Sequence, residues 1–140
     1  MSTRKLIRDD VISALTGLST TGANVFQSRV YPIAENKLPG LCIYTSTDDA
    51  EYATLTPPRT LDRLLTITVE AYVKANTGYD NTLDQIEDEI RTALYADLTR
   101  GGNAQDTRIV AFSSQFNDEG DQPIAYGELT VEVHYTQQEG

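Results

Sequence analysis

The chain has 140 residues, a length typical of one domain, and it is acidic: 11 Lys and Arg stand against 21 Asp and Glu, for a formal net charge of −10. A charge of this sign disfavours tight binding to nucleic acid or to an anionic lipid surface. The single cysteine, Cys42, excludes an internal disulfide, and with one histidine it is too little for a Cys/His zinc site. Leu6 and Ile7 follow the basic N-terminal residues but are interrupted by Arg8, so we expect no signal peptide. No run of about 18 apolar residues occurs, so we expect no membrane-spanning helix.

The N-terminal segment predicts a helix over about Thr3–Leu15. Apolar residues recur on one helical face at Ile7, Val11, Ala14, Leu15 and Leu18. Ser2 or Thr3 is the expected N-cap, and Gly17 is expected to end the helix.

The following segments predict two short strands and two loops. Residues 16–24 are rich in Gly, Ser and Thr and predict a loop, whereas 25–31 predict a strand. A second strand is expected over 41–45. Residues 46–58 are acidic and show no sustained period, so we expect a long loop there, of the kind that is often functional or mobile.

The centre of the chain predicts a strand and an amphipathic helix around which the other elements are arranged. Alternate residues of 64–74 share one apolar face, made by Leu65, Ile67, Val69, Ala71 and Val73. Thr82 followed by Gln85 matches a capping box, so the helix is expected to start there. Its apolar stripe, which should pack on that strand face, is Leu83, Ile86, Ile90, Ala93 and Leu94.

The C-terminal third predicts a second mobile loop over 97–107 and then two strands. The strands are expected over 108–116 and 123–135, and the turn-forming residues 117–121 between them favour an antiparallel hairpin. Together the elements predict a single-domain α+β fold, in which two helices cover one face of an antiparallel or mixed sheet of four to five strands.

No group of residues has the spacing of a catalytic or metal site. His134 has no nucleophile and orienting group in a recognisable motif, and Cys42 lies within a predicted strand, so we expect a surface histidine and a packed thiol. The acidic segments at 48–51 and 118–121 lack the spacing of a calcium loop, and residues 101–102 lack the lysine of a phosphate loop. We therefore expect no metal site and no cofactor.

The chain has eight tyrosines and no tryptophan. Tyr44, Tyr72 and Tyr126 are expected on the sheet face away from the helices, and Tyr52 in the long acidic loop. Because tyrosine is favoured at protein interfaces, we expect a partner or a second copy of the chain to bind there.

Five segments carry a family resemblance: NVFQSRVYP (24–32), PGLCIY (39–44), LTITVEAYV (65–73), DNTLDQIEDEI (80–90) and LTVEVHY (129–135). With the order helix, strand, strand, long loop, strand, helix and hairpin, they resemble the phage tail terminator proteins of the minor tail protein U type. The resemblance covers most of the chain.

This resemblance implies a structural, non-enzymatic virion protein that is assembled in the host cytoplasm. Its subunits would form a ring, expected to be a hexamer, at the head-proximal end of the tail. The ring would end growth of the tail tube protein, bind the head-closure or neck protein, and let DNA pass its lumen without specific binding. Six copies would carry 6 × (−10) = −60 charges, so added salt should not weaken the ring.

The two predicted loops are the expected contacts with the tube or with neighbouring subunits. The candidate contact residues are Asp48, Asp49, Glu51, Tyr52, Arg59, Arg100, Gly101 and Gly102. Other functions remain open: a head-closure or tail-tube protein, an acidic regulatory or inhibitor domain, or a small enzyme that uses paired carboxylates.

Overall fold

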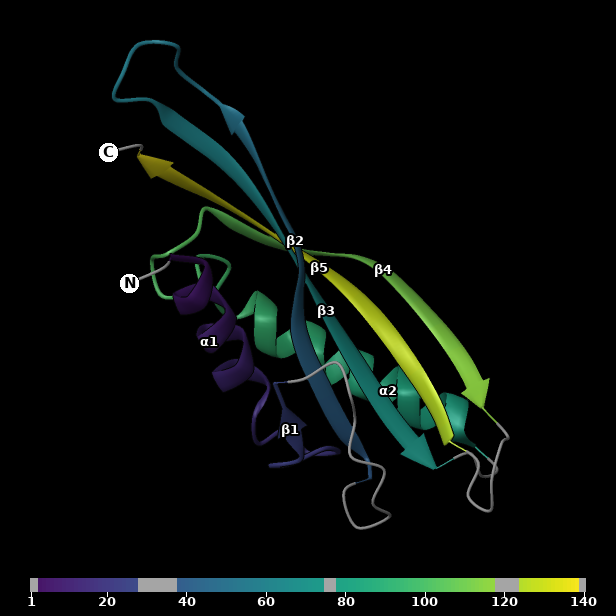
Figure 1. Cartoon of the computed structure of the whole chain (residues 1–140). Coiled ribbons are helices and arrows are strands. Elements are labelled where there is room, and N and C mark those ends of the chain that lie inside the picture. Colours follow the sequence, from purple (N-terminus) through teal and green to yellow (C-terminus); the bar gives the residue numbers. More distant parts are fainter. Residues whose placement is uncertain (1–2, 28–37, 75–77, 118–123, 139–140) are drawn as a thin grey trace.

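A computed structural model of the chain describes residues 3–27, 38–74, 78–117 and 124–138. Within these ranges the elements are α1 (Thr3–Leu15), β1 (Val25–Phe26), β2 (Gly40–Tyr52), β3 (Thr60–Lys74), α2 (Tyr79–Tyr95), β4 (Asp106–Asn117) and β5 (Ile124–Gln138) (Figure 1). The strands form one sheet in the order β1-β2-β3-β5-β4, with β1 parallel to β2 and the other pairs antiparallel. The predicted α+β fold with a mixed sheet is confirmed.

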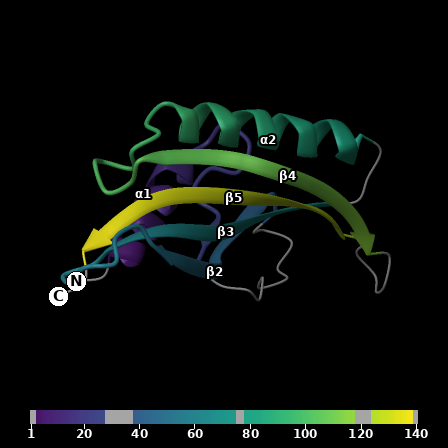
Figure 2. The ribbon, with the colours of Figure 1, turned by 90° about the horizontal axis from the view of Figure 1, so that it is seen from above.

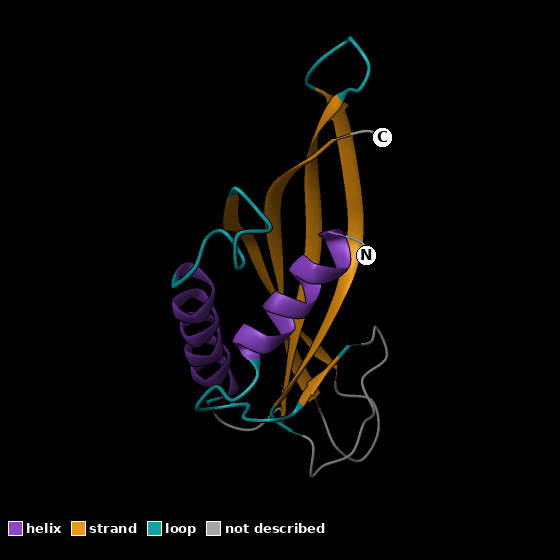
Figure 3. Ribbon diagram, turned by 90° about the vertical axis from the view of Figure 1, so that its left-hand side faces the viewer, coloured by secondary structure: helices purple, strands orange, loops and turns teal. Residues whose placement is uncertain are grey.

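Both helices lie on the same side of the sheet (Figure 3), and α2 runs along the β4 side (Figure 2). The predicted apolar stripes form the core. Its helical part is Ile7, Val11, Leu15, Leu83, Ile86, Ile90 and Leu94, and its sheet part includes Leu41, Ile43, Leu65, Ile67, Val69, Leu129, Val131 and Val133. Each of these side chains is at most 2% exposed. Burial of large aliphatic side chains stabilises a fold by roughly 1.5–3 kcal/mol each, so this layer is the main source of stability.

The ends of the helices differ in part from the prediction. Helix α1 has the predicted bounds, so Thr3 lies inside it, and Ser2 lies outside the described residues. Helix α2 starts at Tyr79 rather than at the expected capping box, because Gly78 takes the left-handed conformation (φ 88°) and begins the helix without a side-chain cap. Thr82 instead donates its hydroxyl proton to the Gly78 carbonyl.

The predicted loop over 46–58 is wrong for its first half. Strand β2 continues to Tyr52 and pairs with β3 along its whole length, with a bulge between Thr45 and Thr47. Only the last part, 53–59, is a turn. The strand lacks an apolar period because this part of β2 extends beyond the helices, so it has no core to face.

The C-terminal hairpin is confirmed, since β4 pairs antiparallel to β5 with a bulge between Ile109 and Ala111. Of the turn predicted at 117–121, Asn117 is the last residue of β4 and the rest lies outside the described residues, as does most of the strand predicted over 25–31.

The tyrosines lie on the predicted face of the sheet. Tyr72 and Tyr126 are directly opposed on β3 and β5, with ring centroids 5.2 Å apart and planes at 22°. Tyr44 is opposite Thr68 and therefore shares this face, which points away from the helices.

Candidate functional site

The most prominent feature of the molecule is a projecting hairpin, here called the arm, which comprises residues 47–66. It contains the distal part of β2, the start of β3 and the turn between them, and the end of β5 pairs alongside it. Figures 1 and 3 show it extending past both helices. Four of the predicted contact residues lie on the arm outside its base: Asp49, Glu51, Tyr52 and Arg59.

Asp48 lies at the base of the arm and is a structural residue. Its side chain is 3% exposed, and its two oxygens accept hydrogen bonds from Arg63 Nε (3.1 Å) and from the Tyr135 hydroxyl (2.6 Å). Arg4 of α1 adds an ion pair at 3.4 Å. Asp48 thus joins α1, β3 and β5 and is buried in the single chain, and its contact with the tube or a neighbouring subunit stays a prediction.

The electrostatics of this cluster follow from its geometry. Burial raises the pKa of Tyr135 to about 12, and the hydrogen bond to Asp48 adds to the shift because the phenol donates a proton to a carboxylate. The hydrogen bond to Asp48 likewise raises the pKa of Arg63. The guanidinium of Arg63 also lies 5.8 Å from the centroid of the Tyr135 ring. These contacts tie the base of the arm to α1 and β5.

The face of the arm that points away from the helices is acidic. A hollow of about 320 Å³ on the arm is lined by three carboxylates and one guanidinium, from Asp49, Glu51, Asp62 and Arg63, together with Leu64 and His134. Glu51 is directly opposite Asp62, and like charges in that position destabilise a strand pair. The arm therefore presents a concentrated negative surface to solvent.

The tip of the arm is apolar and exposed. Leu55 is 87% and Tyr52 57% exposed, and the guanidinium of Arg59 lies 5.3 Å from the centroid of the Tyr52 ring. The turn is closed by hydrogen bonds from the Ala53 amide to the Thr60 carbonyl (2.8 Å) and from the Thr60 amide to Thr54 Oγ1 (2.9 Å). A defined turn thus holds two large apolar side chains, Tyr52 and Leu55, exposed to solvent.

The loop after α2 lies at the same end of the molecule as the arm (Figure 3). The amide of Gln105 donates to the carbonyl of His134 at 2.7 Å, and His134 is opposite Leu64 at the base of the arm. The two segments predicted as contacts are therefore brought to one end of the fold.

Arg100 holds this loop in place. Its side chain is 1% exposed, it donates to the carbonyls of Leu94 and Asp97, and it forms an ion pair with Asp10 at 3.1 Å. Arg100 is thus buried in the single chain, and its contact with the tube or a neighbouring subunit stays a prediction. Gly101 and Gly102 remain exposed, with φ values of 72° and 90° that favour glycine.

Asp97 orders the start of the same loop. Its Oδ1 accepts from the hydroxyl (2.7 Å) and the amide (3.0 Å) of Thr99, and its Oδ2 accepts from the amide of Gly101 (2.8 Å). These bonds to the carboxylate lower the pKa of Asp97.

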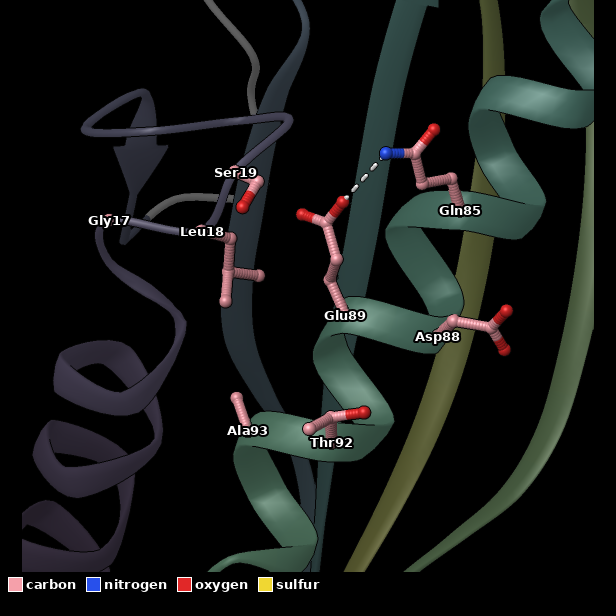
Figure 4. A pocket seen from close by; sticks show the side chains of 8 residues that line it. All are labelled: Gly17, Leu18, Ser19, Gln85, Asp88, Glu89, Thr92 and Ala93. Atoms are coloured by element: carbon pink, nitrogen blue, oxygen red, sulfur yellow. Dashed lines mark hydrogen bonds between the residues drawn. The ribbon is translucent and has the colours of Figure 1, made fainter.

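A second hollow, of about 490 Å³, lies between α2 and the loop that follows α1 (Figure 4). Glu89 on its wall accepts from the amide (3.0 Å) and hydroxyl (2.6 Å) of Thr20 and from Gln85 Nε2 (3.2 Å). Burial alone would raise the pKa of Glu89, but these hydrogen bonds outweigh it and the pKa is lowered. Glu89 thus ties the loop to the helix as an ionised carboxylate, whereas a general acid needs a raised pKa.

The remaining candidates for chemistry have structural surroundings. Burial and the nearby charge of Glu70 raise the pKa of the Cys42 thiol to about 12, so it stays protonated. His134 Nε2 lies 2.7 Å from Arg108 Nη2. Among the described residues, His, Cys, Asp and Glu side chains form no group of three that could hold a metal ion. Neither helix described here is long and apolar enough to span a membrane.

A comparison with known families finds a match that covers nearly the whole chain. The family model of phage minor tail protein U matches residues 2–135. None of the curated proteins compared with the chain matches it.

Proposed function

The chain belongs to the phage minor tail protein U family and is thereby a structural protein of the phage tail. On this premise we propose that it forms a ring that ends the growth of the tail tube. The family match over residues 2–135 is the observation that carries the proposal. Membership favours a non-enzymatic role, in keeping with the hydrogen-bonded carboxylates described above. In this proposal the ring is a hexamer at the head-proximal end of the tail, where its outer surface binds the head-closure or neck protein.

The arm is the part of the molecule best suited to bind the tube. A tube end offers a repeating surface, and a ring of subunits with parallel arms can place one arm on each tube subunit. The apolar tip around Leu55 supplies the area that a stable contact buries, and the acidic face around Glu51 sets the orientation. Gly101 and Gly102 lie at the same end and form the second candidate contact.

Termination then follows from the asymmetry of the ring. One side matches the last ring of the tube, and the other side presents a surface on which no further tube subunit binds. Heterologous contacts that close into a ring avoid open-ended growth. The net charge of −10 per subunit keeps the lumen negative, so DNA passes without binding.

The proposal is tested by polymerising the cognate tail tube protein with and without this chain and measuring tube lengths by electron microscopy. We expect shorter tubes that carry a ring at one end. Tubes of unchanged length and without end rings would contradict the proposal. Growth of this chain alone into tubes would instead identify a tail-tube protein.

The contact through the tip is tested by Leu55→Ser, with Thr56→Ser as the matched control in the same exposed turn. Because Leu55 is 87% exposed, its replacement should leave the melting temperature within a degree or two while tube capping is lost. Thr56→Ser should cap tubes as the wild type does. Normal capping by Leu55→Ser would exclude the tip from the contact.

A further inference from the structure

The sheet has an outer edge at β4 that could accept another strand. Strand β4 pairs with β5 on one side only and is the last strand of the sheet. Near the start of β4, the Thr107 amide donates to Asp106 Oδ1 at 2.9 Å and the Ile109 amide donates to the Tyr95 hydroxyl at 3.1 Å. From Val110 to Gln115, no other described group forms a hydrogen bond to the backbone of this edge. Such an edge is a template for strand pairing.

The chemistry of this edge is unusual for so acidic a chain. Charged residues make up 23% of the sequence, yet the eight residues 109–116 (IVAFSSQF) contain none. Val110 is 48% exposed, and Ala111 and residues 113–115 are exposed as well. Natural edge strands are usually protected by lysine, proline, inward-pointing charges or bulges. In β4 the charged residues are Asp106 and Arg108 at its start, a bulge follows between Ile109 and Ala111, and no charged residue occurs from there to Phe116. An edge without charge is where acidic subunits can meet with the least repulsion.

The opposite side of the sheet also has an unpaired edge. Strand β2 pairs with β1 only at Leu41 and Cys42, so its outer edge along the arm, from Thr47 to Tyr52, has no strand beside it in the described part of the chain. This edge carries Asp49 and Glu51. If the β2 edges of two copies paired with each other, these carboxylates would lie against each other and repel. If the β2 edge paired with the β4 edge instead, the carboxylates would face a stretch of strand without charged side chains.

We propose that the β4 edge of one subunit pairs with the β2 edge of the next copy, so that the sheet continues from subunit to subunit around the ring. This inference rests on the proposed ring. The two edges are different surfaces of one chain, so their pairing is heterologous and generates a cyclic assembly, whereas β4 pairing with β4 would close a two-fold dimer.

The proposal predicts which side chains meet. Ala111 is opposite Thr130, and Asp49 is opposite Leu64, which places both on the sheet face away from the helices. A continuous sheet keeps each face on one side, so a charge introduced at Ala111 lies on the same face as Asp49 and Glu51 of the neighbouring copy.

The test compares Ala111→Glu with Ala111→Lys, and uses Thr92→Glu on the exposed side of α2 as a control with equal net charge. The solution mass of each is measured by light scattering at low and moderate salt, with melting curves to show that each variant folds. We expect Ala111→Glu to lose the ring at low salt and regain it partly at moderate salt, where charges are screened. Ala111→Lys and Thr92→Glu should keep it.

Two results would overturn the pairing of β4 with β2. Rings of wild-type stability in Ala111→Glu would show that β4 lies outside the contact. Loss of the ring in both folded Ala111 variants, but not in Thr92→Glu, would show that β4 meets a surface other than the acidic β2 edge. Either result leaves the proposed function standing, whereas a wild-type chain that forms no ring, with or without tail tubes, refutes the proposed function itself.

Discussion

Asp48→Asn should destabilise the protein far more than the same change at its neighbour Asp49. Asn has nearly the same shape but no charge, so the substitution removes the carboxylate that Arg63 and Tyr135 share. Hydrogen bonds to charged groups contribute roughly 1.5–3 kcal/mol each. The ion pair with Arg4, whose side chain is 46% exposed, adds less than about 1 kcal/mol.

Because Asn keeps one acceptor oxygen, the lower end of the range applies to both hydrogen bonds of Asp48. We therefore expect the free energy of unfolding to fall by about 3 kcal/mol, which for a domain of this size lowers the melting temperature by roughly 10 °C. The assay is urea unfolding followed by circular dichroism, with the slope compared between variants.

Asp49→Asn is the matched control. Asp49 is exposed on the other face of the arm, so its replacement should change stability by less than about 0.5 kcal/mol. If both substitutions lowered the free energy of unfolding by the same small amount, Asp48 would not be part of a buried hydrogen-bonded cluster. A large effect of Asp49→Asn would show that the two strand faces are exchanged in this part of β2.

Two further predictions concern the same sheet. Folding raises the pKa of Tyr135 from its ordinary value of 10 to about 12, so its contribution to stability is complete below pH 10 and is lost as the pH rises towards 12. Between pH 10 and 12, urea unfolding should show that the free energy of unfolding of the wild type falls by roughly 2 kcal/mol more than that of Tyr135→Phe. Equal changes in the two proteins over this pH range would contradict the prediction. Gly127→Ala should destabilise by roughly 1–3 kcal/mol in thermal melts, because its Cβ would lie 2.7 Å from the Phe112 ring. Phe112→Leu in the Gly127→Ala background should recover part of the loss, and no recovery would contradict the clash.

The core of this fold is predictable from the sequence because apolar residues recur with the period of a helix or strand wherever one face of that element is buried. The stripes on α1 and α2 and the alternation in β3 and β5 are buried as the pattern predicts. The predicted start of α2 at Thr82 is wrong because a left-handed Gly78, rather than a polar side chain, begins the helix.

The arm could not be predicted in the same way. Its strands have no core beneath them, so no apolar period distinguishes them from an acidic loop. The burial of Asp48 depends on Tyr135, which is 87 positions away in the sequence, and that of Arg100 on Asp10. Such pairings follow from strand register and loop conformation, for which local sequence gives no signal. Tyr52, Arg59 and Gly101, in contrast, are accessible where the sequence suggested contacts, and their role stays a prediction.

The most direct test of the account is the solution mass of the purified chain by light scattering, over a concentration series at low and moderate salt and with or without tail tubes. We predict one closed species whose mass stops rising with concentration, expected at 6 × 15.5 kDa, or about 93 kDa, which forms by itself or when tubes are added. Added salt should leave it intact. A chain that remains monomeric under every condition, or whose mass grows without limit, would contradict the proposal of a ring that ends the tail tube.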